Sequence, residues 1–259
     1  MPGVDDALLD RDTDADWREL GQSNPYWGVI SHPNFLTENI TPERVDEFYA
    51  SGPFHIDPIA ADLTKLIGSP PGGRAMDFGC GVGRLAEAML KYADQVTGVD
   101  ISPGMLELAR KRGSRVNYVG ELPDGPFDWI NSFIVFQHIP PERGLQLMAE
   151  LLARLAPGGC VSLQVTVWRE QAHVWPASSG WRRWLRAPLQ WLWARRLPVG
   201  QIIMFDYDLS QVVRRLNEAG VVDLTLAPTD HGGHHGVILI GRKTAPAASA
   251  PNASARATA

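Results

Sequence analysis

The sequence has little cysteine, no long apolar run and no excess of positive charge. Its two cysteines among 259 residues, Cys80 and Cys160, form no CxxC pair, which argues against a zinc ribbon or a disulfide framework and favours a reducing compartment. No stretch approaches the roughly 20 apolar residues of a membrane span, and the N-terminus shows no basic start followed by an apolar run. We therefore expect a soluble, cytoplasmic protein.

The charge balance disfavours nucleic acid as a partner. The chain carries 24 Lys and Arg against 29 Asp and Glu, for a formal charge of -5, which gives no general attraction for phosphate backbones. Its hydrophobic fraction of 44% suffices for one large domain with a substantial core.

Both ends are expected to lie outside that core. Residues 1–20 are rich in Asp with few apolar positions, and residues 244–259 are small and polar, so we expect a flexible N-terminus and a disordered tail. Residues 21–74 contain a cap-like Thr41-Pro42-Glu43 and an apolar-periodic run from Ile56 to Ile67. They predict a helical N-terminal cap.

From residue 75 onward, short apolar runs alternate with helical patterns. Five such strands separated by helices imply a doubly wound α/β core, with a mostly parallel sheet covered on both faces. The last two apolar runs, at 221–227 and 236–243, are joined by a loop too short for a crossover helix, so they should pair antiparallel. Residues 170–209 interrupt this alternation with a less regular stretch.

The first strand runs into a glycine-rich turn with the sequence MDFGCGVGR at 76–84. Glycine permits a sharp turn and close approach to a ligand, and a following helix offers unpaired N–H groups. The next strand ends at Asp100, from which a carboxylate can accept both hydrogen bonds of a ribose diol. The pattern predicts a nucleotide-like ligand.

The spacing narrows the choice of ligand. A dinucleotide fingerprint requires glycine where Arg84 stands, and a Walker loop requires a terminal Lys and Ser or Thr that are absent here. Arg84 suits a carboxylate, and Asp77 before the turn could pair with an ammonium group. An amino acid joined to adenosine would use both, which is the shape of S-adenosylmethionine.

The chain resembles the class I S-adenosylmethionine-dependent methyltransferases over residues 75–243. The matching motifs are MDFGCGVGR, VTGVDISPGMLELAR, VGELP, FDWINSFIVFQHIP and LARLAPGGCVSLQV. The resemblance implies a Rossmann-like fold with a seven-stranded sheet whose last strand is antiparallel. It also implies that residues 170–209 form an insertion on the substrate side.

The resemblance also implies residue roles. It assigns the methionine part to Asp77, Gly79, Gly81 and Arg84, the ribose to Asp100, the adenine faces to Ile101 and Met105, the adenine edge to Glu121 and Leu122, and the sulfonium side to Phe133. Glu121 has two interpretations: it accepts from the adenine amine, or it is a surface acid whose backbone alone makes the contact.

Histidines are the candidate bases for a methyl acceptor. His138 follows the fourth strand at the carboxyl-end face, where ligands of parallel sheets bind; alternatively it caps the next helix or packs on an aromatic ring. The sequence HGGHHG places His231, His234 and His235 in the loop joining the last two strands, at the same face. We consider them further base or substrate-binding candidates, and we expect no metal site because no Cys partner adjoins.

Two aromatic regions add candidates for the acceptor side. In the cap, Trp27, Tyr26 and His55 are candidates for a lid that excludes water, although packing also explains the aromatics. The Trp/Arg-rich stretch at 181–197 is amphipathic. It could cover the active-site mouth, form a homodimer interface or an apolar substrate pocket, or contact a membrane surface.

These observations predict a methyltransferase for a small-molecule or glycan-like acceptor, with oxygen favoured over nitrogen because of the candidate histidine bases. The alternatives are an N- or C-methyltransferase, a nicotinamide-dependent oxidoreductase and a non-catalytic cofactor-binding module.

Overall fold

The computed structural model describes residues 8–170 and 197–245, and its centre is one seven-stranded sheet in the order β3-β2-β1-β4-β5-β7-β6. The strands are β1 (Arg74–Phe78), β2 (Gln95–Val99), β3 (Asn117–Val119), β4 (Phe127–Ser132), β5 (Leu155–Arg169), β6 (Val221–Asp230) and β7 (His234–Lys243). Strands β1 to β5 are parallel, and β7 pairs antiparallel with both β5 and β6. The predicted fold class is confirmed.

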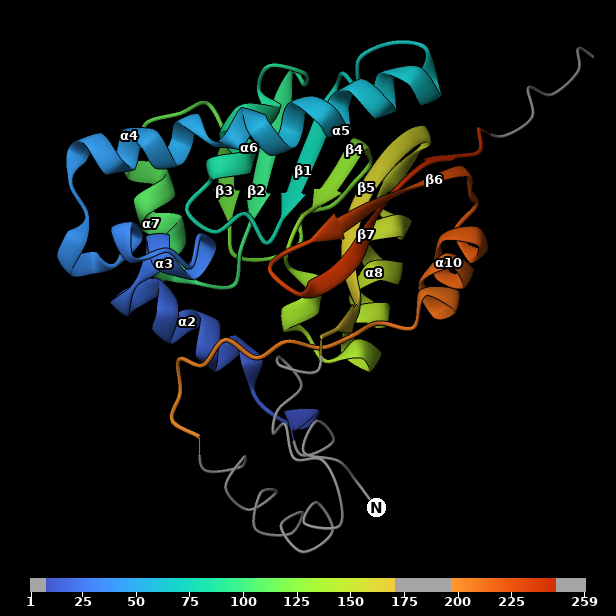
Figure 1. Cartoon of the computed structure of the whole chain (residues 1–259). Coiled ribbons are helices and arrows are strands. Elements are labelled where there is room, and N and C mark those ends of the chain that lie inside the picture. The colour runs from blue at the N-terminus through green and yellow to red at the C-terminus, as the bar shows by residue number, and fades with distance from the viewer. Residues whose placement is uncertain (1–7, 171–196, 246–259) are drawn as a thin grey trace, which may run out of the picture.

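Helices cover both faces of the sheet (Figure 1). Along β1 and β4 neighbouring side chains alternate: Ala75 and Trp129 pack in one buried cluster with α5 (Gly52–Ile67), α6 (Arg84–Met89) and α7 (Pro103–Lys111). Met76 and Ile130 pack in a second cluster with α8 (Pro141–Ala153) and α10 (Leu209–Glu218). This period of two explains why the strands of a sheet buried on both faces read as continuous apolar runs.

The N-terminal part is more ordered than we expected. Residues 13–20, expected to be flexible, lie in α2 (Thr13–Ser23), which begins where the Asp12 side chain accepts from the Ala15 N–H. Asp14 and Asp16 lie in its first turn, where the helix dipole favours negative charge, and Leu20 is buried. The aspartates that suggested a mobile segment are therefore the start signal of a helix.

Helical structure continues from α2 to the sheet. It comprises α3 (Pro25–Val29), the 3-10 turns η1 (Pro33–Phe35) and η2 (Thr37–Asn39), α4 (Pro42–Ala50) and α5. The Thr41 hydroxyl caps α4 by accepting from the Arg44 N–H. Helices α2 and α3 lie at the edge toward which β1 to β4 point (Figure 1), so this segment covers the carboxyl ends of those strands.

Two segments noted in the sequence remain to be located in the structure. The Pro-Gly-Gly sequence at 157–159, part of the LARLAPGGCVSLQV motif, lies within β5, where the register with β4 shifts between Phe127 and Trp129. The Trp/Arg-rich stretch, apart from Leu197, and most of the C-terminal tail lie outside the described residues. No helix in the described ranges is long and apolar enough to cross a membrane.

Candidate functional site

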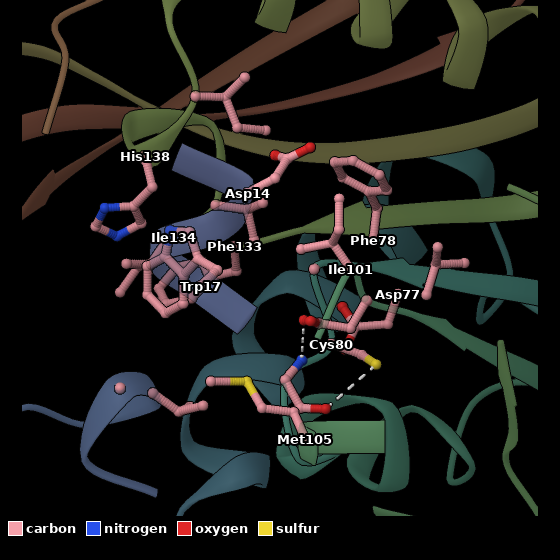
Figure 2. A pocket seen from close by; sticks show the side chains of 18 of the residues that line it. Asp14, Trp17, Asp77, Phe78, Cys80, Ile101, Met105, Phe133, Ile134 and His138 are labelled. Atoms are coloured by element: carbon pink, nitrogen blue, oxygen red, sulfur yellow. Dashed lines mark hydrogen bonds between the residues drawn. The ribbon is translucent and has the colours of Figure 1, made fainter. Parts of the chain in front are cut away.

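A cavity of about 290 Å³ lies at the carboxyl ends of β1, β2 and β4. The turns after β1 and β2 form one wall, and α2, α3, α8 and the turn after β4 form the other. In Figure 2, Asp77, Phe78 and Ile101 lie across the cavity from Trp17, Ile134 and His138. This is the position in which an open α/β sheet binds its ligand.

The glycine turn contributes exposed backbone to the first wall. Gly81 has φ 54° and lies where an added Cβ would come within 2.7 Å of the Val29 side chain on α3. Gly83 has φ 90°, and its Cβ would fall 2.1 Å from the Tyr118 hydroxyl. Any side chain here would meet both a strained backbone and occupied space, so the turn brings bare backbone to the cavity.

Asp100, after β2, is bonded to this turn. Its Oδ2 accepts from the Gly81 N–H at 2.8 Å and its Oδ1 from the Ser102 N–H at 2.8 Å. Burial raises the pKa of this carboxyl, and the backbone donors, from Ser102 first, oppose that rise. Each oxygen keeps further acceptor capacity, so Asp100 can hold the turn and still accept from a ligand hydroxyl.

Asp77 and Arg84 lie at the other end of the first wall, and both are buried. Burial raises the pKa of Asp77 to about 7, against a donated hydrogen bond from Asn131 and the nearby charge of Arg84. Burial lowers the pKa of Arg84 to about 10, which still leaves it charged at neutral pH. The Arg84 Nη1 donates to Ser51 Oγ at 3.2 Å and lies 3.2 Å from His55 Nδ1.

Unsatisfied atoms test whether these residues fit the cofactor implied by the resemblance. The Oδ2 of Asp77 and the Nε of Arg84 are buried and have no hydrogen-bond partner within the part of the chain that the structure describes. A buried polar atom without a partner is costly, and these two would accept from an ammonium group and donate to a carboxylate. The residues therefore fit the amino acid end of S-adenosylmethionine.

The opposite wall is largely apolar and comes from distant segments. Trp17 on α2, Ile134 and Ile139 after β4, and Leu147 on α8 line it. Ile134 has φ 58°, a left-handed conformation that is rare for a β-branched residue and stores roughly 1–3 kcal/mol of strain. Its N–H donates to the buried Gln164 Oε1 at 3.1 Å.

His138 also lines this wall. Its Nδ1 lies 2.9 Å from the Ile203 carbonyl, which can only accept, so Nδ1 carries the proton and Nε2 the lone pair. Nε2 lies 3.4 Å from the Gln137 amide nitrogen, and the Trp17 ring meets the imidazole edge to face at 4.8 Å between centroids. Burial lowers the pKa of His138 to about 4, which keeps it neutral at pH 7.

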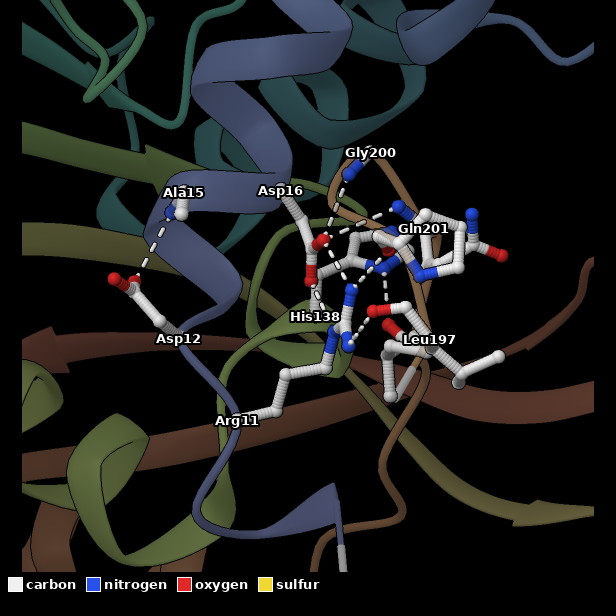
Figure 3. A network of polar contacts seen from close by, with 10 residues as sticks. Arg11, Asp12, Ala15, Asp16, His138, Leu197, Gly200 and Gln201 are labelled. Carbon is white, nitrogen blue, oxygen red and sulfur yellow. Dashed lines mark hydrogen bonds and ion pairs between the residues drawn. The ribbon is translucent and has the colours of Figure 1, made fainter. Parts of the chain in front are cut away.

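Ion pairs hold this second wall together. The Asp14 carboxylate receives two bonds of 2.7 Å from Arg143 on α8. Asp16 is buried and receives bonds of 2.6 and 2.7 Å from Arg11, and its Oδ1 also accepts from the Gly200 N–H at 2.9 Å (Figure 3). These bonds attach α2 to α8 and to the segment at 197–205, which carries the carbonyl bonded to His138.

Most of the predicted cofactor residues line the cavity, namely Asp77, Gly79, Gly81, Arg84, Asp100, Ile101, Met105, Leu122 and Phe133. Glu121 does not line it, and its side chain is exposed. This placement favours the interpretation of Glu121 as a surface acid.

The other histidine and aromatic candidates lie behind the cavity wall. Trp27 packs in the aromatic cluster around Phe48, and His55 contacts Arg84 and the Phe133 ring, at 5.0 Å between centroids. Burial, followed by the charge of Arg84, lowers the pKa of His55 to about 4.

The HGGHHG sequence, expected to be a loop, forms a short turn at 231–233, and His234 and His235 already lie in β7. His231 meets the Phe133 ring edge to face at 5.7 Å, and burial lowers its pKa. His235 stacks on Trp168 at 3.9 Å and lies 3.4 Å from Glu170. Neither these two nor His234 lines the cavity, whereas the Phe133 ring that His231 contacts does. Among the described residues no group of His, Cys, Asp and Glu is placed to hold a metal ion.

Sequence reasoning missed the residues of α2 and α8 that line the cavity, chiefly Asp14, Trp17 and Arg143. The available signal was the Asp-rich helix start at residue 12 followed by Trp17. Nothing in the sequence pairs Asp14 with a residue 129 positions away.

Comparison with known proteins gives a family for the central part of the chain. Residues 75–159 match the family described as methyltransferase domain, and they contain the glycine turn, Asp100 and the turn carrying His138. These residues therefore belong to a methyltransferase domain. The cofactor of this family is S-adenosylmethionine, in agreement with the fit of Asp77 and Arg84.

Curated relatives of this methyltransferase domain act on different acceptors. The ubiquinone biosynthesis O-methyltransferase of Xanthomonas campestris pv. campestris is 31% identical over 155 residues, covering 51% of this chain and 64% of that protein. The trans-aconitate 2-methyltransferase of Methylobacterium nodulans is 35% identical over 113 residues, covering 41% and 43%. The chain thus spans less than two thirds of the length of these relatives.

A solved structure shares the fold over most of the chain. Magnesium protoporphyrin IX methyltransferase from Synechocystis PCC 6803, with bound S-adenosylhomocysteine, has a TM-score of 0.61 and 16% identity, covering 90% of this chain and all of that one. The shared region therefore extends beyond the methyltransferase domain into the flanking segments.

Proposed function

We propose that this chain is an S-adenosylmethionine-dependent methyltransferase that methylates an oxygen atom of a small-molecule acceptor. The observation that carries the proposal is the pair of unsatisfied buried atoms, Asp77 Oδ2 and Arg84 Nε, beside a bare glycine turn whose Gly81 N–H donates to Asp100. An amino acid zwitterion joined to a ribose would pair with Asp77, Arg84 and Asp100 at once. A nicotinamide cofactor has no ammonium group for Asp77.

The bound cofactor would supply an electrophilic methyl group, and the residues of the chain bind, orient and exclude water. Asp77 and Arg84 would hold the amino acid end and Asp100 the ribose diol. Trp17 and Ile134 form an apolar opposite wall, which excludes water from the space between cofactor and acceptor. Alignment of the two reactants is the largest contribution expected from such a site.

His138 is our candidate for the group that receives the acceptor proton. Its tautomer leaves a lone pair on Nε2, and the Ile203 carbonyl would stabilise the protonated ring through Nδ1. Its low pKa makes it a weak base, which suits an acidic hydroxyl such as a phenol or an enol, or a carboxylic acid, better than a sugar hydroxyl.

The acceptor class follows from the same wall. An apolar surface with one ion pair, Asp14 with Arg143, favours a flat or apolar acceptor with an acidic group over a glycan. The relative named trans-aconitate 2-methyltransferase supports an acidic acceptor, and the one named ubiquinone biosynthesis O-methyltransferase supports methylation at oxygen.

Two measurements test the proposal. Isothermal titration should show micromolar binding of S-adenosylmethionine and none of NAD. Release of S-adenosylhomocysteine should then depend on an added acceptor in a panel of phenols, carboxylic acids, amines and sugars. Binding of NAD would overturn the cofactor assignment, and turnover only with amines would overturn methylation at oxygen.

A further inference from the structure

A row of polar side chains crosses three strands beneath the cavity. Asp77 on β1 is the register partner of Asn131 on β4, which is the register partner of Ser162 on β5. Trp129 lies two residues before Asn131 and so projects from the same face of β4. All four side chains are at most 2% exposed, so water cannot satisfy them.

Hydrogen bonds connect the four residues end to end. The Trp129 indole N–H donates to Ser162 Oγ at 2.9 Å, and the Ser162 hydroxyl donates to Asn131 Oδ1 at 2.7 Å. The Asn131 amide then donates to Asp77 Oδ1 at 2.8 Å. Each link is within the normal range for its donor and acceptor.

The direction of these hydrogen bonds follows from the donor at one end, the Trp129 indole. An indole nitrogen can only donate, so Ser162 must accept from it and has one proton left to give. That proton fixes the Asn131 oxygen toward Ser162 and turns its NH₂ group toward Asp77. With the amide reversed, the Asn131 oxygen would face the carboxylate and repel it.

We propose that Trp129, Ser162 and Asn131 are positioning residues that hold Asp77 with one oxygen occupied and the other directed to the cofactor ammonium. This rests on the proposed function. Asp77 lines the cavity, and its Oδ2 has no partner in the described ranges, whereas its Oδ1 is held by Asn131. Nothing in the glycine motif itself fixes this rotation, because the bonds come from two other strands.

This series of hydrogen bonds also affects the charge of Asp77. A hydrogen bond donated to a carboxylate favours the ionised form, so Asn131 lowers the pKa that burial raises. The charged groups facing Asp77 are Arg84 on α6, which lowers the pKa, and Asp100 after β2, which raises it. The Cys80 thiol and the Tyr118 hydroxyl also face it, and burial raises the pKa of each, so both are neutral at pH 7.

The test is Ser162→Ala, which removes the central hydroxyl and frees the Asn131 amide to reverse. We expect the Kd of S-adenosylmethionine to rise about tenfold at pH 7. When the pH is lowered, the affinity of Ser162→Ala should begin to decline at a higher pH than that of the wild type, because the variant's Asp77 takes up its proton more readily. The Kd of 5′-methylthioadenosine, which lacks the amino acid end, should not change.

Two further variants control for structural damage. Ser162→Thr keeps the hydroxyl and should restore the Kd to within about twofold of the wild type. Ser132→Ala removes a buried hydroxyl on β4, the strand of Asn131, that has no partner among the described residues, so it should leave both Kd values unchanged. ¹³C NMR of the aspartate carboxyls should show a higher Asp77 pKa in Ser162→Ala than in wild type, with no cofactor present.

The outcomes separate the two proposals. Equal weakening of S-adenosylmethionine and 5′-methylthioadenosine in Ser162→Ala would overturn the positioning role, as would an unchanged Kd and an unchanged Asp77 pKa, and the proposed function would stand. Failure of the wild type to bind S-adenosylmethionine would overturn both.

Discussion

The two walls of the cavity are built in different ways. We call the first the cofactor wall and the second the acceptor wall, after the ligands proposed for them. The cofactor wall comes from short consecutive turns, with the Gly79 and Cys80 N–H groups both bonded to the Val99 carbonyl at 2.8 and 2.9 Å. The acceptor wall joins α2, α8 and the segment at 197–205 through the Asp14–Arg143 ion pair and through backbone N–H groups that donate to Asp16, and these partners lie between 129 and 185 residues away. The backbone of the first wall is therefore formed by neighbouring turns, whereas the second wall depends on long-range contacts.

This difference separates the two binding functions. Backbone bonds and glycine conformations shape the cofactor wall, so few substitutions there are tolerated. Side chains shape the acceptor wall, and they can change without moving the glycine turn. We expect variants of one wall to leave the function of the other almost intact.

Asp100→Ala should have the largest effect. It removes the carboxylate that accepts from Gly81 and Ser102 and that would accept from the ribose, so we expect S-adenosylmethionine affinity to fall about 1000-fold or more, measured by isothermal titration. Asp94→Ala, at an exposed acid of the preceding loop, is the matched control. Unchanged affinity in Asp100→Ala would refute the cofactor assignment.

Asp77→Asn should raise stability while abolishing tight cofactor binding. Because the pKa of Asp77 is raised from 3.8 to about 7, the folded protein holds this proton more tightly than the unfolded chain, so stability falls as pH rises from about 4 to 7. Asp77→Asn has no such carboxyl to ionise, so its free energy of unfolding at pH 8 should exceed that of the wild type by up to about 4 kcal/mol. Urea denaturation at pH 5 and pH 8 measures it. Equal pH dependence in both proteins would contradict the account.

Asp16→Ala should loosen the acceptor wall. It leaves Arg11 and the Gly200 N–H without their buried partner, at a cost of about 3 kcal/mol, or a fall in Tm of about 8 °C. Hydrogen exchange should increase in α2 and at 197–205, and bound cofactor should still protect the glycine turn. Asp10→Ala, at an exposed position, serves as the control. Increased exchange at the glycine turn instead would show that the walls are coupled.

His138→Ala should lower kcat about 100-fold and leave the Kd of S-adenosylmethionine within about twofold. Since the pKa of His138 is lowered to about 4, the wild-type imidazole stays neutral above about pH 5, so this group causes no fall in kcat between pH 8 and 6. The exposed His32 provides the control variant, His32→Ala. Full activity in His138→Ala would show that His138 is not the base.

Prediction from the sequence succeeded where a residue acts within a short segment. The spacing of Gly81 and Arg84, with Asp100 at the end of the next strand, pointed to the cofactor class, because a turn and its helix are local. It failed for Trp17, whose helix has an Asp-rich start that resembles a mobile end. Trp27 was preferred, but although both tryptophans pack against the same aromatic cluster, Trp17 lines the cavity and Trp27 does not. The sequence pattern alone does not tell which of the two faces the cavity.

The sequence by itself determined the alternation of strands and helices, the glycine turn and the acids around it, because these depend on periodicity and on backbone conformation along a few residues. Only the tertiary structure decided that Asp14 meets Arg143, that the histidines of the HGGHHG sequence do not line the cavity, and that Ser162 turns the Asn131 amide toward Asp77. Those relations depend on strand register and on contacts between segments far apart in the chain, which no local pattern encodes.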